Sequence, residues 1–414
     1  MMANVIPVVL AQHVETAVHL AGLRPALLSA PHVALRHLAR SDERLAAHLD
    51  GLIVAGPAGI RALEQTVEET SAAAVFVGSV CSLSDPDPRM ERFVALCAAE
   101  PQWLPGLTMA CGWVEPRQLQ GLAMRLLDSA VAIQRLLGLA ACAWHRVDPG
   151  VRLTRGLEDV DSTVRARALR TAGELGRSAL LSTCTRLADD PDLTCRFWGA
   201  WSAVLLGDRR AALEKLVSIA GAPGPFQEQA FSLVMQVMPV ATARDFLRTG
   251  PWGAGDTRRL IRGAGLVGDP TYISWLIGLM SDDSCARIAG EAFSLITGVD
   301  LAQLDLERKP PASESGPNDD PNDANVGTDE DDGLPWPEAE RVKGWWDANA
   351  QRFQSGVRHF MGEPLNPERC LQVLRTGYQR QRIAAATYLP LLNPGSSLFE
   401  WRAPASRQAQ LLAN

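Results

Sequence analysis

The histidines near the start of the sequence are the first residues whose chemistry could bind a metal ion. His13 and His19 flank Glu15, and His32 and His37 could supply further ligands. In the zinc-binding H-E-x-x-H motif, the two histidines lie one helical turn apart and share a face. His13 and His19 are six residues apart and do not share a helix face. We therefore predict no metal site and interpret these imidazoles as helix caps or buried hydrogen-bonding groups.

A glycine pattern at Gly263, Gly265 and Gly268 matches the dinucleotide-binding motif G-x-G-x-x-G. That motif follows a β-strand, whereas the periodicity here is helical, so close packing between helices explains the glycines better. The sequence contains neither a G-x-x-x-x-G-K-[ST] phosphate loop nor a G-x-S-x-G nucleophile elbow. We therefore expect a protein that is not an enzyme and that holds no cofactor.

A cluster of arginines is a candidate for binding an acidic partner protein. Arg258, Arg259 and Arg262 could line a concave surface that attracts negative charge. The chain carries its own acidic segment, Asp319 to Asp332, on a tether long enough to reach that surface. Two interpretations follow: the segment folds back as a regulatory competitor, or it is a freely moving loop beside a solvated face.

Two adjacent tryptophans form a second candidate surface for a partner. Trp345 and Trp346, together with Arg358, belong to the densest aromatic and basic group in the sequence. Tryptophan and arginine are common anchors of protein interfaces. Adjacent residues cannot both face one side of a helix, so one tryptophan could be exposed. The alternative is that both pack a terminal helical cap onto the rest of the chain.

The charge of the chain is concentrated in one segment. Ten acidic and two basic residues lie between Asp305 and Asp332, a net charge of −8, whereas the whole chain of 414 residues carries −7. The rest is nearly neutral and has no basic footprint for nucleic acid. The segment is rich in Pro, Gly, Asn and acid, and it cannot bury enough apolar surface to offset its ordering entropy. We predict a disordered linker over 305–337.

Helical patterns lie on both sides of this segment. From Gly156 to Gly176, Asp161 can cap a helix whose apolar residues follow at helical spacing. The same pattern returns at Asp192, 31 residues later. Two helices in each period of roughly 30 to 40 residues indicate an all-α helical solenoid, an α-α superhelix.

A D-x-x-x-R unit recurs in these periods. The Asp caps the helix and suits its dipole, and the Arg one turn later can pair with an Asp in its own repeat or in a stacked neighbour. The predicted ladder consists of Asp161, Arg165, Asp192, Arg196, Asp283 and Arg287. The pattern fails at Asp128, where Ala132 stands in place of the Arg. The sequence resembles HEAT repeats at the ladder positions.

The predicted organisation has four parts. Residues 1–120 form a helical region with divergent repeats, and 121–304 form the HEAT-like repeats. The acidic linker over 305–337 then leads to a C-terminal helical cap over 338–414.

The cysteines and the apolar segments indicate a cytoplasmic protein. None of the eight cysteines forms a C-x-x-C pair, and most lie among apolar residues, where cysteine acts as a small hydrophobe. The start, Met1 to Leu10, lacks the basic region and cleavage site of a signal peptide. The apolar stretches Leu52–Ile60 and Ala72–Cys81 are too short to span a bilayer. We therefore expect no membrane partner.

Five stretches carry a further resemblance: Ile6–Leu20, Asp42–Gly56, Arg287–Leu301, Trp345–Asn349 and Gly377–Ala386. In them the sequence resembles an uncharacterised family of bacterial HEAT-repeat proteins often encoded near type VI secretion genes. It departs from that family at Ala21–Arg24, where a bulky residue is expected before the Arg. The resemblance implies a helical repeat fold in the bacterial cytosol and brings no catalytic residues.

The leading hypothesis is a non-catalytic protein-binding scaffold, adaptor or chaperone, with a type VI secretion effector or spike component as a candidate partner. An immunity protein that neutralises a toxin is an alternative, and tight binding to one toxin would distinguish it. A HEAT-like enzyme, such as a bilin lyase or a DNA-repair glycosylase, is a further alternative. No cysteine is linked to tetrapyrrole chemistry, and the chain lacks the basic surface that a DNA-repair enzyme needs.

Overall fold

The chain folds into two compact units of α-helices. The computed structural model describes residues 6–66, 70–84, 89–311 and 329–413, which are mostly helical and confirm the predicted all-α class. Unit 1 holds the described residues of Met1–Ser29, Val33–Ala212 and Asn393–Asn414, and unit 2 those of Ala30–His32 and Leu213–Leu392. Within the described ranges, no helix has the length and apolar character needed to cross a bilayer.

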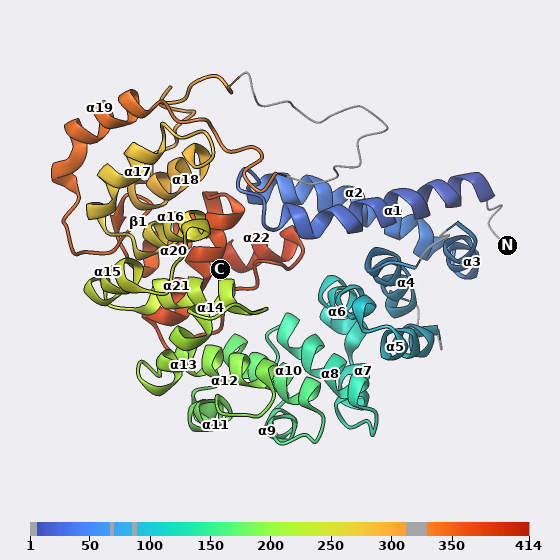
Figure 1. Ribbon diagram of the computed structural model, residues 1–414. Coiled ribbons are helices and arrows are strands. Elements are labelled where there is room, and N and C mark those ends of the chain that lie inside the picture. The colour runs from blue at the N-terminus through green and yellow to red at the C-terminus, as the bar shows by residue number, and fades with distance from the viewer. Residues whose placement is uncertain (1–5, 67–69, 85–88, 312–328, 414) are drawn as a thin grey trace. The chain divides into compact units, whose positions relative to one another are not determined.

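The described residues in the first half of unit 1 form six helices. They are α1 (Pro7–Leu27), α2 (Leu35–Val54), α3 (Pro57–Thr66), α4 (Ala72–Ser84), α5 (Arg89–Ala99) and α6 (Leu104–Trp113). Helix α4 is buried from Ala74 to Leu83 and packs on both α1 and α6, so it lies at the centre of this half (Figure 1). Its sequence is mostly apolar, with Ser79 and Ser82 also buried, as expected of a helix without a solvent face.

The second half of unit 1 is built from three pairs of helices. The pairs are α7 (Leu122–Leu127) with α8 (Ala132–Trp144), α9 (Val151–Leu157) with α10 (Ser162–Glu174), and α11 (Leu181–Leu187) with α12 (Leu193–Leu205). The second helices pack on one another in the order α8, α10, α12 (Figure 1). Gly173 allows the close approach of α10 and α12, since a Cβ there would lie 2.5 Å from the hydroxyl of Ser202.

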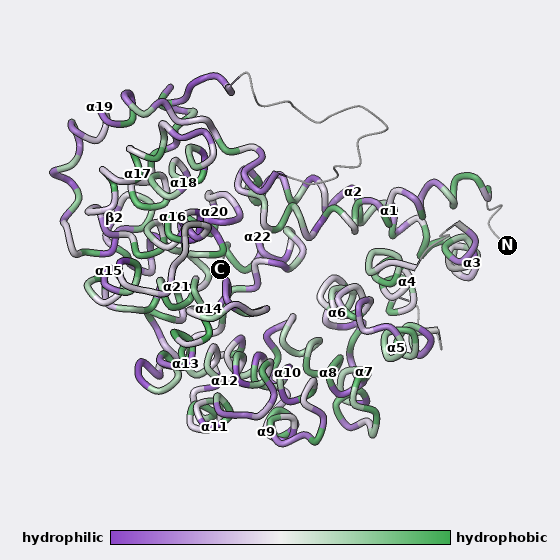
Figure 2. Tube along the Cα trace, in the orientation of Figure 1, coloured by the Kyte–Doolittle hydropathy of each residue, from purple (hydrophilic) through white to green (hydrophobic). Residues whose placement is uncertain are grey.

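The described part of unit 2 contains nearly all the remaining helices and one hairpin. After α13 (Ala211–Ala220), which begins at the border, it has α14 (Gln227–Val237), α15 (Val240–Thr249), α16 (Thr257–Val267), α17 (Ile273–Leu279), α18 (Ala286–Thr297), α19 (Ala339–Asn349), α20 (Pro367–Thr376) and α21 (Gln379–Leu392). Strands β1 (His359–Phe360) and β2 (Glu363–Pro364) pair antiparallel. Helix α16 packs on α14 and α18 around the buried Ile261, Leu276 and Phe293. Hydrophobic and hydrophilic residues alternate along these helices (Figure 2), as expected where one face is buried.

The last part of the chain belongs to unit 1. Helix α22 (Ala405–Ala413) packs on α2, and the backbone N–H of Ala405 donates to the Asp42 carboxylate at 2.8 Å. Upstream, the N–H of Leu398 donates to the carbonyl of Glu174 at 3.0 Å. The predicted cap over 338–414 is therefore divided, with 338–392 in unit 2 and 393–414 in unit 1. The predicted repeat block over 121–304 also crosses the border of the units, at residue 212.

The predicted disordered linker is wrong at both of its ends, while residues 312–328 lie outside the described ranges. Leu306 and Trp336 are buried. The N–H of Arg308 donates to the Trp336 carbonyl at 2.7 Å, and Glu307 forms an isolated antiparallel bridge with Pro337. These apolar and backbone contacts offset the entropy lost when the two ends become ordered. The prediction of disorder rested on the average composition of the segment, which does not show these contacts.

Candidate functional site

Three equivalent arginines connect the helix pairs of unit 1. Arg135, Arg165 and Arg196 each lie in the first turns of α8, α10 or α12. The Nη1 atom of each donates to two carbonyls in the turn before its helix, at distances of 2.8–3.1 Å. The same contacts therefore recur in three successive helix pairs.

Two of these arginines also reach the neighbouring pair. Arg135 forms a bidentate ion pair with Asp159, at 2.7 and 2.8 Å, and its hydrogen bonds hold the pKa of that carboxyl below its usual range. Arg165 likewise pairs with Asp190, at 3.2 and 3.3 Å. The sequence left open whether each ladder arginine pairs with an Asp in its own repeat or in a stacked neighbour. Arg135 and Arg165 both pair with an Asp of the neighbouring helix pair.

The aspartates chosen from the sequence act as caps. Asp161 accepts from the N–H of Thr163 at 2.8 Å, and Asp192 accepts from the N–H of Cys195 at 2.9 Å. The pattern failed at Asp128 because the repeat was aligned on the wrong residue. Arg135 is the equivalent arginine of the α7–α8 pair.

The third predicted rung, Asp283 with Arg287, has different contacts in unit 2. Asp283 pairs with Arg308 at 2.5 Å, and Arg287 pairs with Asp329 at 2.6 Å. The guanidinium of Arg287 also lies over the Trp336 ring, 4.6 Å from its centroid. Arg287 therefore binds the residues that follow the undescribed part of the acidic segment.

The predicted arginine surface of unit 2 holds acidic side chains of the same chain. Arg258 Nη2 donates to both oxygens of Asp331 at 2.8 Å. Arg262 Nη2 lies 2.6 Å from Glu330. These ion pairs lower the pKa of Glu330, with the hydrogen bond from Arg262 as the largest cause. The described end of the acidic segment therefore contacts this surface, and its role as a regulatory competitor stays a prediction. The part from Asp319 to 328 lies outside the described residues.

Two other predicted arginines are held by contacts within the fold. Arg259 pairs with Glu228 at 2.7 Å and also with Asp256. Arg358 donates to three main-chain carbonyls, those of Met235, Leu266 and Met238, at 2.6–2.7 Å. We exclude both from the surface that could receive a partner, because breaking these bonds would leave polar groups of the fold unsatisfied.

Trp345 and Trp346 are both half-buried and pack on the core of unit 2. The ring centroid of Trp345 lies 5.8 Å from that of Phe293, and that of Trp346 lies 5.4 Å from that of Phe353. The sequence left open whether one tryptophan is exposed or both pack on the rest of the chain. Both side chains pack helix α19 onto the core of unit 2.

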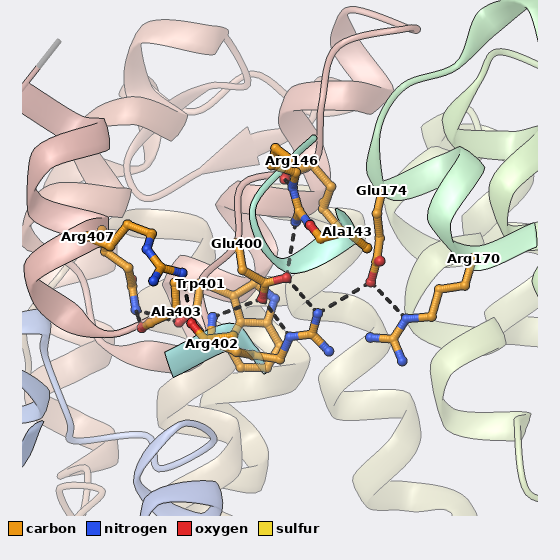
Figure 3. Close-up of polar contacts among 12 residues, drawn as sticks. Ala143, Arg146, Arg170, Glu174, Glu400, Trp401, Arg402, Ala403 and Arg407 are labelled. Carbon is orange, nitrogen blue, oxygen red and sulfur yellow. Dashed lines mark hydrogen bonds and ion pairs between the residues drawn. The ribbon is translucent and has the colours of Figure 1, made fainter. Parts of the chain in front are cut away.

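The sequence did not point to a buried ionic network in unit 1 (Figure 3). Glu174, at the end of α10, binds Arg167 and lies 2.8 Å from Arg170 and 3.3 Å from Arg402. Arg402 also binds Glu400 through two hydrogen bonds, at 2.6 and 2.7 Å. No spacing in the sequence connects these residues, because the C-terminal segment reaches α10 only in the folded chain.

The network lowers the pKa of both glutamates. Burial alone would raise the pKa of Glu174, but the charges of Arg167, Arg170 and Arg402 together lower it. Burial alone would also raise the pKa of Glu400, but the charges of Arg402 and Arg146 lower it. Both carboxylates are therefore charged in the folded chain at neutral pH.

The other candidate chemistry has structural explanations. Within the described ranges, no three His, Cys, Asp or Glu residues are arranged to hold a metal ion. His13 Nδ1 lies 3.0 Å from His48 Nδ1. Gly263, Gly265 and Gly268 lie in or directly after helix α16, and a Cβ at Gly265 would lie 3.1 Å from Ala292. All eight cysteines are buried.

No protein-family model matches the sequence, and a search of the curated proteins finds no similar chain.

Proposed function

We propose that this chain is a HEAT-type helical repeat protein that binds another protein and has no catalytic role. Support for the repeat assignment comes from the three helix pairs between α7 and α12 and from the equivalent contacts of Arg135, Arg165 and Arg196. Helical repeat proteins present extended surfaces and work mostly by binding.

One observation carries the proposal: an arginine surface on unit 2 already holds a short acidic segment. We define the arginine surface by Arg258, Arg262 and Arg287, which bind Asp331, Glu330 and Asp329 respectively. Charge-assisted hydrogen bonds to carboxylates are among the stronger polar contacts, and clusters of arginine recognise acidic motifs. The proposed partner therefore offers an acidic segment, and residues 329–331 compete with it for the surface.

The family resemblance suggests which partners to test first. It supports a bacterial cytoplasmic setting and an effector or spike component of type VI secretion as the acidic partner. The partner binds where the chain's own acidic segment now lies, so its affinity depends on how easily that segment is displaced.

Binding of a fluorescein-labelled hexaglutamate peptide, measured by anisotropy at low salt, tests the surface. Neutralising the competitor in Asp329→Asn/Glu330→Gln/Asp331→Asn should tighten binding about tenfold, the scale of a typical coupling between two ligands. Adding Arg258→Gln and Arg262→Gln to this variant should abolish the gain. Equal binding by the wild type and the triple variant would contradict the proposal.

A matched control separates this surface from general charge effects. Lys343 forms an exposed pair with Asp347 on α19, so Lys343→Gln changes the net charge without touching the arginine surface. Peptide binding should be the same in this variant as in the wild type. A natural partner captured from bacterial lysate should be retained by Lys343→Gln and lost with Arg258→Gln/Arg262→Gln.

A further inference from the structure

Unit 1 contains a pocket with a volume of about 560 Å³. Helices α6, α8, α10 and α12 line it, together with Arg24 and Arg402. Apolar side chains, including Leu104, Met109 and Leu136, form part of its wall. Pockets of this size and composition usually receive a small molecule, oriented by a few polar groups.

The polar groups that line this pocket are arginine nitrogens with hydrogen-bonding capacity left over. Arg170 uses Nε to bind Glu174, and neither of its Nη atoms donates a hydrogen bond to any described residue. The Nη1 atoms of Arg167 and Arg402 likewise have no acceptor in the described part of the chain. Three guanidinium groups on the pocket wall can therefore donate to a ligand.

Tryptophans hold two of these guanidinium groups in place. Arg170 stacks on Trp198, with its Cζ 4.5 Å from the ring centroid, and Arg402 stacks on Trp144 at 4.7 Å. Both tryptophans line the same pocket. Each cation–π contact restricts the motion of its guanidinium group, so less ordering is needed when a ligand arrives.

The part of the pocket next to the ionic network carries a net positive charge. Four guanidinium groups share two carboxylates, which leaves an excess of two positive charges: Arg146, Arg167, Arg170 and Arg402 against Glu174 and Glu400. Asp192 also lines the pocket, but it caps the start of α12, about 9 Å along the helix axis from Trp198. Burial, together with the neighbouring guanidinium charges, lowers the pKa of Arg170 to about 10.

We propose that this pocket binds a small organic dianion, in which a phosphate monoester or a pair of carboxylates is attached to an apolar or aromatic group. The dianion neutralises the excess charge and accepts from Arg167, Arg170 and Arg402. The attached group packs on Leu104, Met109 and the rest of the apolar wall. This site is independent of the arginine surface in unit 2.

Calorimetric titration of the full chain with phenyl phosphate at low salt tests the proposal. Phenyl phosphate should bind, inorganic phosphate should bind about tenfold more weakly because it lacks the apolar group, and benzyl alcohol should not bind. Isophthalate distinguishes a paired-carboxylate ligand from a phosphate. Absence of binding by both dianions, or equal binding of phenyl phosphate and inorganic phosphate, would overturn the proposal.

Substitutions locate the site. Arg170→Gln should weaken phenyl phosphate binding at least about tenfold, the loss expected when a charged donor is removed. Glu174 keeps Arg167 and Arg402 as partners in this variant, so the fold should persist. Arg186→Gln, on an exposed position of α11, should bind like the wild type.

A measurement on the wild type keeps the test valid if Arg170→Gln misfolds. Phenylglyoxal modifies accessible arginines, and mass spectrometry maps the modified positions. Phenyl phosphate should protect Arg170 and leave Arg186 reactive. Loss of binding in both Gln variants, or equal modification of Arg170 with and without ligand, would contradict a site in this pocket.

Discussion

Glu174 and Arg402 are 228 positions apart in the sequence, yet their Oε1 and Nη2 atoms lie 3.3 Å apart. Glu174 ends helix α10, and Arg402 lies in the C-terminal segment. Glu174 is buried and Arg402 is half-buried, so the carboxylate depends on its arginine partners rather than on water. The contact makes the last residues of the chain part of the fold of unit 1.

This network should make the stability of unit 1 depend on pH. Interactions with arginines lower the pKa of Glu174 and of Glu400 in the folded chain, so both carboxylates stabilise the fold above their ordinary unfolded pKa of about 4.3. Their contribution is lost as the pH falls below that value, because the unfolded chain then binds protons first. The free energy of unfolding from urea titrations should decline steeply between pH 5 and 3. Glu174→Gln should be less stable at pH 7 and show a shallower decline, whereas equal slopes would contradict this account.

Loss of the Asp42 carboxylate should destabilise unit 1 strongly. Arg24 and Asp42 form a buried bidentate pair at 2.8 and 3.2 Å, and Arg24 also donates to the carbonyls of Arg402 and Ala403. Asp42→Asn leaves the Arg24 charge buried without a counter-charge, which typically costs about 3–5 kcal/mol. Urea unfolding at pH 7 measures the loss. Arg92→Gln, which breaks an exposed pair with Glu64, is the control and should change stability by less than about 1 kcal/mol.

The cysteines should be unreactive in the native chain. All eight are buried, and burial raises the pKa of Cys81, Cys111 and Cys184 to about 12, so few thiolates form near neutral pH. Ellman's reagent at pH 8 should detect almost none of them before unfolding and all eight in concentrated urea. Rapid reaction of any cysteine in the native chain would show that its site opens without global unfolding.

Local features of the fold could be predicted from the sequence because their causes are local. Helical periodicity identified the all-α class, and Asp161 and Asp192 were found as caps because a cap acts on the next residues along the chain. The opposite charges of Arg262 and the acidic segment were also visible as composition. A helix cap or a run of charged residues depends on only a few neighbouring residues, so it can be predicted from one sequence.

The ionic network of unit 1 and the linker ends could not be predicted, since their contacts are long-range. Nothing near Glu174 in the sequence indicates that Arg402 will lie beside it. Trp336 follows a strongly acidic run whose average composition predicts disorder. The composition does not show that Arg287 and Arg308 contact its ring. The partners of Arg165 were left open for a related reason, because Asp190 belongs to the next helix pair.

The ion pair between Arg165 and Asp190 should couple neighbouring helix pairs. Its side chains are 17% and 5% exposed, so solvent screens it less than a surface pair. A double-mutant cycle with Arg165→Gln and Asp190→Asn, measured by urea unfolding, should give a coupling energy of about 1–2 kcal/mol. The exposed pair of Arg92 and Glu64 should give less than about 0.5 kcal/mol in a parallel cycle. Similar values for both pairs would show that the contact between helix pairs adds nothing.

Trp336 should anchor the end of the acidic segment in unit 2. The guanidinium carbons of Arg287 and Arg308 lie 4.6 and 5.2 Å from the centroid of its ring, and its side chain is buried. Trp336→Ala removes both cation–π contacts and a large apolar surface, so unit 2 should lose about 3 kcal/mol of stability. Trp275, which is 39% exposed on α17, provides the matched control, and Trp275→Ala should cost much less.

Limited proteolysis separates local release from general destabilisation of unit 2. Release of residues 329–337 in Trp336→Ala should give early cleavage in that range, under conditions where α16 and α18 stay intact, because the ion pairs of Asp329 and Asp331 alone cannot hold the segment against its ordering entropy. If the cleavage pattern instead matches that of the wild type, the arginine surface holds the segment without Trp336. The acidic competitor would then be anchored by charge alone, and its release should depend on salt concentration.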